Sequence, residues 1–215
     1  ADYQGDILLD NRSISDMEPP ARARLAAYVP QSHVPVFGYT VLDVVLMGTF
    51  AQNGWLRSPG AKQRTAAREA LDRVGIASLS DRDYTRISGG ERQLVLIARA
   101  LAQQTGILMM DEPTANLDYG NQLRILEQIV SLASEGYSIV LSTHHPEQAF
   151  LYAGQVLALL DGRVLCCGPP NELVTAELML ALYGVEVEIE RLHDDRFRVC
   201  IPKAALRRPP NGGQG

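Results

Sequence analysis

Short apolar runs alternate along the chain with stretches of helical periodicity, a pattern typical of helices that cover a mostly parallel sheet. One helix is predicted over residues 62–75, where Gly75 can end it. Its apolar face is formed by Ala66, Ala70, Leu71 and Val74. A second helix is predicted over residues 89–103, with an apolar stripe formed by Leu94, Ile97, Ala98 and Leu101. The fold class predicted from this alternation is α/β.

Two short apolar runs and two hairpins complete the expected strands. Residues 107–110 and 138–142 are predicted to be buried parallel strands, because each continuous apolar run ends in polar groups. Parallel sheets place their sites at strand ends of this kind. Residues 156–167 predict a hairpin that turns at Asp161-Gly162 and closes the edge of the sheet. Residues 186–202 predict a second hairpin.

The size of the chain limits how many domains it can form. A chain of 215 residues with 46% hydrophobic content can bury one good core, so we expect a single domain over residues 1–206. We expect a helical subdomain at about residues 40–104 and a disordered, Pro- and Gly-rich tail over residues 207–215. The longest apolar stretches fall far short of the roughly 20 residues of a spanning helix, so the chain is not expected to cross a membrane.

Charge and cysteine content exclude some classes of function. The formal net charge is -5 and the basic residues are scattered, whereas a nucleic-acid binder needs a basic face. We therefore expect no nucleic-acid partner. Cys166, Cys167 and Cys200 are odd in number and two are adjacent, which suits neither a disulfide framework nor a zinc site. A reducing cytoplasm fits this pattern best.

Two adjacent acids, Asp111 and Glu112, follow the apolar run of residues 107–110. Adjacent carboxylates at a strand end repel each other unless a cation lies nearby. The pattern favours a magnesium nucleotide site, in which Asp111 holds hydrated Mg²⁺ and Glu112 polarises the water that attacks the γ-phosphate. The alternative is that the two acids only cap the following turn.

A second candidate lies upstream, where Ser88, Gly89, Gly90 and Glu91 open the predicted helix of residues 89–103. The two glycines let backbone N–H groups approach an anion, and the helix N-terminus favours negative charge. A helix start alone would need only Ser88, and a Gly-Gly pair alone is common in turns. In this chain Ser-Gly-Gly-Glu is followed, after one predicted strand, by Asp-Glu-Pro-Thr. The two segments in this order form a specific combination.

These segments resemble the motifs of ABC ATPases, and the resemblance covers essentially the whole chain. Residues 88–93 resemble the signature motif and residues 107–112 the Walker B strand. Residues 28–31 resemble the Q-loop, residues 116–118 the D-loop and residues 142–144 the switch-histidine loop. All five occur in the family's usual order, which single motif matches do not provide.

The resemblance implies ATP and Mg²⁺ as cofactors, held between two copies of the subunit. Ser88, Gly89 and Gly90, together with Glu91, would act on the γ-phosphate held by the second copy. Gln31 would reach the magnesium ion and the attacking water. By itself, a lone Gln in a loop is ordinary solvated surface.

Two further roles follow from the same resemblance. His144 would hydrogen-bond the γ-phosphate and hold the water and Glu112 in line, although an isolated histidine is more often structural. Asp118 would cross the dimer interface, and it also suits the N-cap of the helix that contains Leu123 and Leu126. His145 and Glu91 differ from the commonest family residues at their positions. Neither difference is expected to abolish ATP hydrolysis in the family.

Three segments resemble one branch of the family, the ATPases that import iron chelates, haem and vitamin B12. They are residues 39–48, 118–122 and 182–185. This branch implies a homodimer bound to two permease subunits at the cytoplasmic face of the cell membrane, fed by an extracytoplasmic substrate-binding protein. Molybdate and tungstate importers share these patterns, so the transported substrate stays open.

One family motif is not found among these residues. ABC ATPases carry a Gly-x-x-x-x-Gly-Lys-Ser/Thr loop, the Walker A motif, that grips the phosphates, and the chain has no such run. Residues 5–10 resemble the strand that follows the helix of this loop. We therefore expect negligible ATP hydrolysis by these residues alone, marginal stability and exposed apolar surface.

Two alternative functions are weighed against the importer motor. One is a soluble ABC ATPase of DNA repair or translation, disfavoured by the uninterrupted distance from Gln31 to Ser88 and by the acidic balance. The other is a non-catalytic interaction module, which would dock a permease or contribute residues 88–90 to a complete partner.

Overall fold

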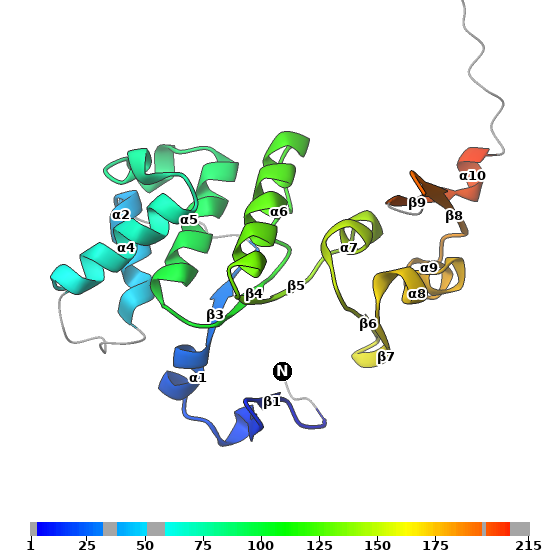
Figure 1. Cartoon of the computed structure of the whole chain (residues 1–215), viewed down its shortest axis with the longest axis horizontal. Coiled ribbons are helices and arrows are strands. Elements are labelled where there is room, and N and C mark those ends of the chain that lie inside the picture. The colour runs from blue at the N-terminus through cyan, green and yellow to red at the C-terminus, as the bar shows by residue number, and fades with distance from the viewer. Residues whose placement is uncertain (1–3, 32–37, 51–58, 195–196, 207–215) are drawn as a thin grey trace, which may run out of the picture. The chain divides into compact units, whose positions relative to one another are not determined.

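The computed structural model describes residues 4–31, 38–50, 59–194 and 197–206. The chain divides into two compact units, Ala1–Ser142 and Thr143–Gly215, coloured blue to green and green to red in Figure 1. The predicted tail of residues 207–215 lies outside the described residues. The expected single domain over residues 1–206, with its helical subdomain, stays a prediction.

The first unit contains a small parallel sheet and most of the long helices. Its strands are β1 (Leu8–Leu9), β2 (Arg12–Ser13), β3 (Ala26–Val29), β4 (Ile107–Met110) and β5 (Ser138–Leu141). Its α-helices are α1 (Pro19–Leu25), α2 (Val41–Leu46), α4 (Ala61–Arg73), α5 (Gly89–Ala102) and α6 (Tyr119–Ser134). Its 3-10 helices are η1 (Ile14–Asp16), η2 (Met47–Thr49), η3 (Ala77–Leu79) and η4 (Tyr84–Arg86).

The second unit is built from short helices and two hairpins. Its helices are α7 (Pro146–Tyr152), α8 (Pro170–Leu173), α9 (Ala176–Tyr183) and α10 (Lys203–Leu206). Its strands are β6 (Val156–Leu160), β7 (Arg163–Gly168), β8 (Val187–Leu192) and β9 (Phe197–Pro202).

The parallel sheet has the strand order β3-β4-β5. The register pairs Val29 with Met110 and Met110 with Leu141, so the carboxyl ends of all three strands stop at the same level. The ladder continues one step further, because the Asp111 N–H donates to the Val29 carbonyl and the Ser142 N–H donates to the Met110 carbonyl. Segments far apart in sequence therefore meet at one edge, as the sequence predicted for β4 and β5.

The helices begin and end where the sequence provides caps. Ser88 caps α5 in a capping box with Glu91, and Thr40 caps α2 in the same way with Asp43. Helix α4 is followed by Gly75 in the left-handed region, with a φ of 74°. The two helices predicted over residues 62–75 and 89–103 are thus confirmed as α4 and α5. On α4, Ala67 is fully buried, whereas the predicted core residue Ala66 is half-buried.

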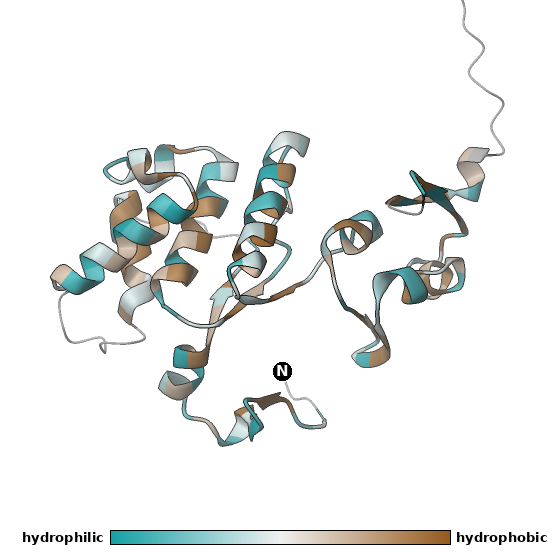
Figure 2. Ribbon diagram, in the orientation of Figure 1, coloured by the Kyte–Doolittle hydropathy of each residue, from teal (hydrophilic) through white to brown (hydrophobic). Residues whose placement is uncertain are grey.

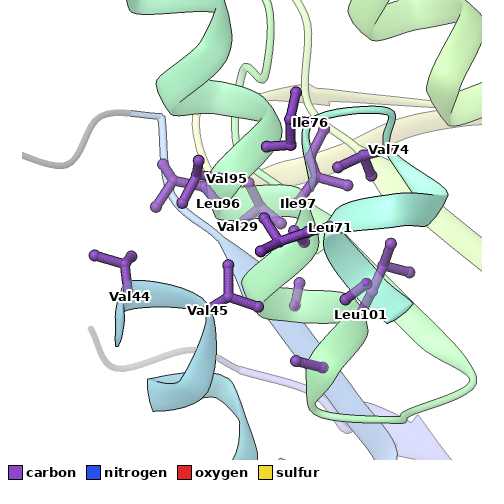
Figure 3. Close-up of a cluster of buried hydrophobic side chains, with 14 of the residues drawn as sticks. Val29, Val44, Val45, Leu71, Val74, Ile76, Val95, Leu96, Ile97 and Leu101 are labelled. Atoms are coloured by element: carbon purple, nitrogen blue, oxygen red, sulfur yellow. The ribbon is translucent and has the colours of Figure 1, made fainter. Parts of the chain in front are cut away.

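The main core lies where α5 packs on one face of the parallel sheet and α2 and α4 pack against α5. Figure 3 shows side chains from these helices and from β3 meeting in this cluster, among them Val45, Leu71, Ile97 and Val29. Figure 2 shows hydrophobic and hydrophilic residues alternating along α4, α5 and α6. Among the described residues, no helix combines the length and hydropathy that a membrane span requires.

The opposite face of the parallel sheet carries a row of exposed apolar side chains. Tyr28, Met109 and Val140 occupy one register position across β3, β4 and β5 and are 56%, 46% and 59% exposed. Their strand neighbours Ala27, Val29 and Leu108 point to the other face and are buried. This row is an exposed apolar surface of the kind expected from the sequence.

Both hairpins of the second unit form as predicted. Strands β6 and β7 are antiparallel and turn at Asp161 and Gly162, which both have positive φ. Strands β8 and β9 are also antiparallel. Strands β6 and β7 pair with each other in a two-stranded sheet. Because they belong to the second unit, their closure of the parallel sheet stays a prediction. At the N-terminus, the predicted strand is limited to Leu8–Leu9, with residues 1–3 outside the description.

Candidate functional site

Asp111 and Glu112 lie at the carboxyl edge of the parallel sheet, directly after β4. Strand β4 is the middle strand, so its end is flanked by the ends of β3 and β5. Gln31 follows β3 and Ser142 follows β5, which brings side chains from both neighbours to the two acids. Both carboxylates are half-buried. The sheet topology thus assembles the predicted acidic site from three separate segments.

The Asp111 carboxylate accepts a hydrogen bond on each of its oxygens. The Ser142 hydroxyl donates to Oδ1 at 2.8 Å, and the Tyr28 hydroxyl donates to Oδ2 at 3.1 Å. The two donors come from the strands on either side of β4. A carboxylate has about four lone-pair positions, so these two bonds orient Asp111 and leave acceptor capacity for a cation.

The Glu112 carboxylate is held by Gln31, whose Nε2 amide donates to Oε2 at 2.9 Å. The Glu112 backbone N–H donates to the Ser142 hydroxyl at 2.9 Å. Glu112 also has a φ of 42°, in a region that residues other than glycine rarely adopt. Backbone strain of this kind persists only where surrounding contacts fix it, and it gathers at functional sites. The structure therefore brings Gln31, Asp111 and Glu112 together.

Tyr28 keeps its proton at neutral pH. Burial raises the pKa of the Tyr28 phenol, and its hydrogen bond to Asp111 and the negative charge of that carboxylate raise it further. The hydroxyl is consequently a permanent donor toward Asp111 in the physiological range.

The start of α5 is fixed by a reciprocal pair of hydrogen bonds. The Glu91 N–H donates to the Ser88 hydroxyl at 3.2 Å, and the Ser88 N–H donates to the Glu91 carboxylate at 2.7 Å. Hydrogen bonding of the Glu91 carboxylate to the Ser88 backbone, and then to the Ser88 side chain, lowers the pKa of Glu91. Ser88 and Gly89 are exposed, whereas Gly90 is buried. The first N–H groups of a helix lack intrahelical acceptors, so this end can receive an anion.

Helix α6 begins beside the start of α5. Asp118 is the N-cap of α6, as expected, and it accepts from the Asn121 backbone and side chain at 2.9 and 2.6 Å. These bonds from the Asn121 backbone and side chain lower the pKa of Asp118. A Cβ at Gly90 would lie 2.5 Å from Asn121 Oδ1. Gly90 thus permits the close approach of the two helix starts, which places Asp118 near the segment of residues 88–91.

His144 belongs to the second unit, where its side chain is exposed. It follows Thr143, whose hydroxyl donates to Gln148 Oε1 at 2.7 Å and accepts from the His145 N–H at 3.1 Å. These bonds fix the turn into α7, and His145 is the N-cap residue of that helix. The role of His144 beside Glu112 stays a prediction.

A separate cavity of about 660 Å³ lies in the first unit between α4, the α5–β4 turn and the α6–β5 turn. None of the predicted site residues lines it. Its rim carries the ion pair of Arg73 with Glu135 at 3.1 Å, and Arg73 also donates to the Tyr137 hydroxyl at 2.8 Å. Among the described residues that line it, Arg73 is the one cation, and it is already paired with Glu135.

Sequence reasoning gave no role to the hydroxyls of Tyr28 and Ser142 or to Asn121. Ser142 could have been found from the parallel register, because a residue one position beyond β5 must lie beside Asp111. Tyr28 lies two residues short of that level, and only its long side chain reaches the acid. No sequence pattern indicates that reach.

An edge of parallel strands with paired acids that keep open acceptor positions, together with a helix start elsewhere in the same unit that can receive an anion, is typical of α/β nucleotide-hydrolysing proteins. The chain belongs to the ABC transporter family, which its residues 1–115 match.

Relatives and solved structures agree with this assignment. The chain is 42% identical over 190 residues to an uncharacterized ABC transporter ATP-binding protein of Haemophilus influenzae, covering 88% of this chain and 72% of the relative. It is 35% identical over 207 residues to the petrobactin import ATP-binding protein FpuD of Bacillus anthracis, covering 95% and 75%. A solved ABC transporter described as metal-chelate type, in an inward-facing conformation, superposes with a TM-score of 0.76 at 31% identity, covering 85% and 74%.

These similarities confirm the predicted fold class and the predicted family, including its importer branch. The chain is an ATP-binding subunit of the ABC class, as its motifs predicted.

Proposed function

We propose that this chain is the ATP-hydrolysing motor subunit of an importer, with the reaction centred on Glu112. The observation that carries the proposal is the hydrogen-bonded edge at β4, where Gln31 holds Glu112 and two hydroxyls hold Asp111. Glu112 would polarise the attacking water and accept a proton from it.

The same edge suits magnesium. Mg²⁺ is usually bound through one or two carboxylates together with nucleotide phosphates and waters, not by an all-protein cage. Asp111 offers such a carboxylate, and within the described ranges no three His, Cys, Asp or Glu side chains gather into a metal cluster. We assign Asp111 and Gln31 to the metal. The Mg²⁺ ion would neutralise part of the negative charge on the phosphates.

The start of α5 would act on the nucleotide of a second copy of the subunit. Ser88, Gly89 and Gly90 present N–H groups and a helix N-terminus, which favour a phosphate. Glu91 holds this start in shape through its bond from the Ser88 N–H. Asp118, next to Gly90 through Asn121, would couple the two sites.

His144 would complete the γ-phosphate contacts. A neutral imidazole can donate from one nitrogen and accept on the other, which suits a group that holds both phosphate and water. Its exposed side chain at the start of the second unit is compatible with that role.

The expected partners follow from the importer branch. We propose membrane permease subunits as the direct partners and an extracytoplasmic substrate-binding protein as an indirect one, with the motor at the cytoplasmic face of the membrane. The similarity to an import ATP-binding protein and to a metal-chelate type transporter supports this assignment. The cargo class stays a prediction: an iron-siderophore, haem, cobalamin or a related metal or oxyanion substrate.

These residues alone should not turn over ATP. The lysines of the chain, Lys62 and Lys203, follow Ala61 and Pro202, so neither stands in a Gly-Lys-Ser/Thr loop. Positioning of the phosphates accounts for most of the catalysis in phosphoryl transfer, and a lysine loop provides much of it. A magnesium-dependent turnover by residues 1–215 alone that disappears in Glu112→Gln would contradict this part of the proposal.

The test of the whole proposal uses the native subunit isolated with its membrane from its own cells. The expected result is co-purification with a multi-helix membrane protein and magnesium-dependent ATP hydrolysis that Glu112→Gln abolishes. Turnover without a membrane partner would indicate a soluble ABC ATPase. A membrane partner without turnover would indicate a non-catalytic interaction module.

A further inference from the structure

Tyr28 lies on the face of the parallel sheet that carries the exposed apolar row of Tyr28, Met109 and Val140. Its side chain is 56% exposed, while its neighbours Ala27 and Val29 are 1% and 0% exposed and supply the core contacts of the strand. At the same register position, β4 and β5 carry Met109 and Val140, which have no hydroxyl. Of the three residues in this row, Tyr28 carries a hydroxyl, and that hydroxyl has a partner at the edge of the sheet.

The phenol reaches along the sheet to the acid at its edge. Tyr28 pairs with Met109, and Asp111 lies two residues beyond, roughly 6.6 Å further along the strand. The Tyr28 hydroxyl spans this separation and donates to Asp111 Oδ2 at 3.1 Å. A shorter polar side chain at the same position would not reach that oxygen.

Tyr28 provides one of two hydrogen bonds that hold the Asp111 carboxylate, one on each of its oxygens. Ser142 donates to the other oxygen from the opposite flanking strand, at 2.8 Å. Hydroxyls on both oxygens prevent rotation of the carboxylate about its terminal torsion, which is otherwise broad. A ligand carboxylate fixed by outer hydrogen bonds binds a metal more tightly than a freely rotating one.

We propose that Tyr28 is a positioning residue that orients the Asp111 carboxylate for the metal ion of the nucleotide. This inference rests on the proposed function, in which Asp111 holds that ion. Tyr28 acts through Asp111 and touches neither the nucleotide nor the water. Its hydroxyl fixes Oδ2 from the β3 side, so that the remaining lone pairs of both oxygens point in one defined direction.

The test is metal affinity measured without turnover. Mn²⁺ is titrated into the native full-length subunit in the presence of a non-hydrolysable ATP analogue and followed by electron paramagnetic resonance. Tyr28→Phe, which removes only the hydroxyl, is expected to weaken Mn²⁺ binding about tenfold, the effect of one hydrogen bond to a charged group. Tyr28→Leu, which removes the ring as well, is expected to weaken it to the same extent.

Tyr183→Phe is the matched control, because Tyr183 lies in α9 of the second unit and also loses only a hydroxyl. Its Mn²⁺ affinity is expected to equal that of the wild type. Thermal unfolding of each variant checks the fold, and a melt of Tyr28→Phe like that of the wild type separates positioning from general destabilisation.

The outcomes separate this inference from the proposed function. Unchanged Mn²⁺ affinity in Tyr28→Phe, together with loss of binding in Asp111→Asn, overturns the role of Tyr28 alone. Unchanged affinity in both variants overturns the metal site and the role of Tyr28 with it. A tenfold loss in Tyr28→Phe with wild-type affinity in Tyr183→Phe supports the inference.

Discussion

Gln31 and Glu112 are 81 positions apart in sequence, yet the Gln31 amide donates directly to the Glu112 carboxylate. The contact arises because Gln31 follows β3 and Glu112 follows the adjacent parallel strand β4. The parallel pairing of the two strands therefore joins two segments that are distant in sequence through one hydrogen bond at the candidate site.

Replacing Glu112 by Gln should remove hydrolysis but not nucleotide binding. The amide cannot accept a proton from the attacking water, and general-base groups contribute about 10²- to 10⁴-fold to rate. We expect kcat of the native full-length subunit to fall at least about 100-fold, with ATP-analogue affinity unchanged. The measurement is steady-state ATPase activity beside equilibrium analogue binding.

The matched control for this change is Glu172→Gln, an exposed acid in α8 of the second unit. It removes one negative charge at a position outside the candidate site, and its kcat should equal that of the wild type. Equal rates in Glu112→Gln and the wild type would refute the catalytic role of Glu112.

Ser142 joins the two acids, because its hydroxyl accepts from the Glu112 N–H and donates to Asp111. Ser142→Ala should lower the free energy of unfolding by about 1 kcal/mol, the net value of a hydrogen bond in partly exposed surroundings. It should also weaken Mn²⁺ binding, because the hydrogen bond from Ser142 to Asp111 Oδ1 is lost. Urea unfolding and the Mn²⁺ titration measure the two effects separately.

Ser138→Ala is the comparison variant, since Ser138 begins the same strand β5 at its other end. It should leave Mn²⁺ affinity unchanged. If Ser142→Ala binds Mn²⁺ as the wild type does, Ser142 has no part in holding the metal ligand.

The sequence was sufficient to predict most of this arrangement. The apolar runs of β4 and β5 end in acids and in Ser142, and parallel strands bring such ends to one edge, so the acidic site could be predicted without coordinates. The capping residues Ser88 and Asp118 were predictable for the same local reason, because each precedes a helical apolar stripe.

Other features depend on distances that no local pattern encodes. The reach of Tyr28 to Asp111 depends on the register of β3 with β4 and on the length of one side chain. The packing of Gly90 against Asn121 depends on how α5 and α6 approach each other.

Gly48 permits a close contact between η2 and α5. A Cβ at this position would lie 2.0 Å from the carbonyl oxygen of Arg99, a backbone atom that cannot turn aside. Gly48→Ala should therefore force the two segments apart and lower the free energy of unfolding by about 3 kcal/mol, as other overpacked cores do. The measurement is urea unfolding followed by circular dichroism.

Gly106→Ala provides the control, because no atom lies within 4 Å of the Cβ that it would add. It should change the free energy of unfolding by less than about 0.5 kcal/mol, the usual range of substitutions that disturb no contact. Similar unfolding curves for Gly48→Ala and Gly106→Ala would show that η2 can shift without cost.

The capping box at the start of α5 predicts a pH dependence of stability. The pKa of Glu91 is lowered from its usual value of 4.5, first by the bond with the Ser88 backbone and then by that with its side chain. A depressed folded-state pKa means that the folded protein binds fewer protons than the unfolded chain in this range. The contribution of Glu91 is therefore present in full above pH 4.5 and declines as the pH falls through the lower, folded-state pKa.

Glu91→Gln isolates this contribution, because the amide can still accept from the Ser88 N–H but does not titrate. We expect the wild type to be more stable than the variant at pH 7 and the difference to shrink steadily below pH 4.5. Urea unfolding of both proteins between pH 7 and pH 3 measures the difference directly. A gap that stays constant across this range would mean that the charge on Glu91 does not stabilise the start of α5.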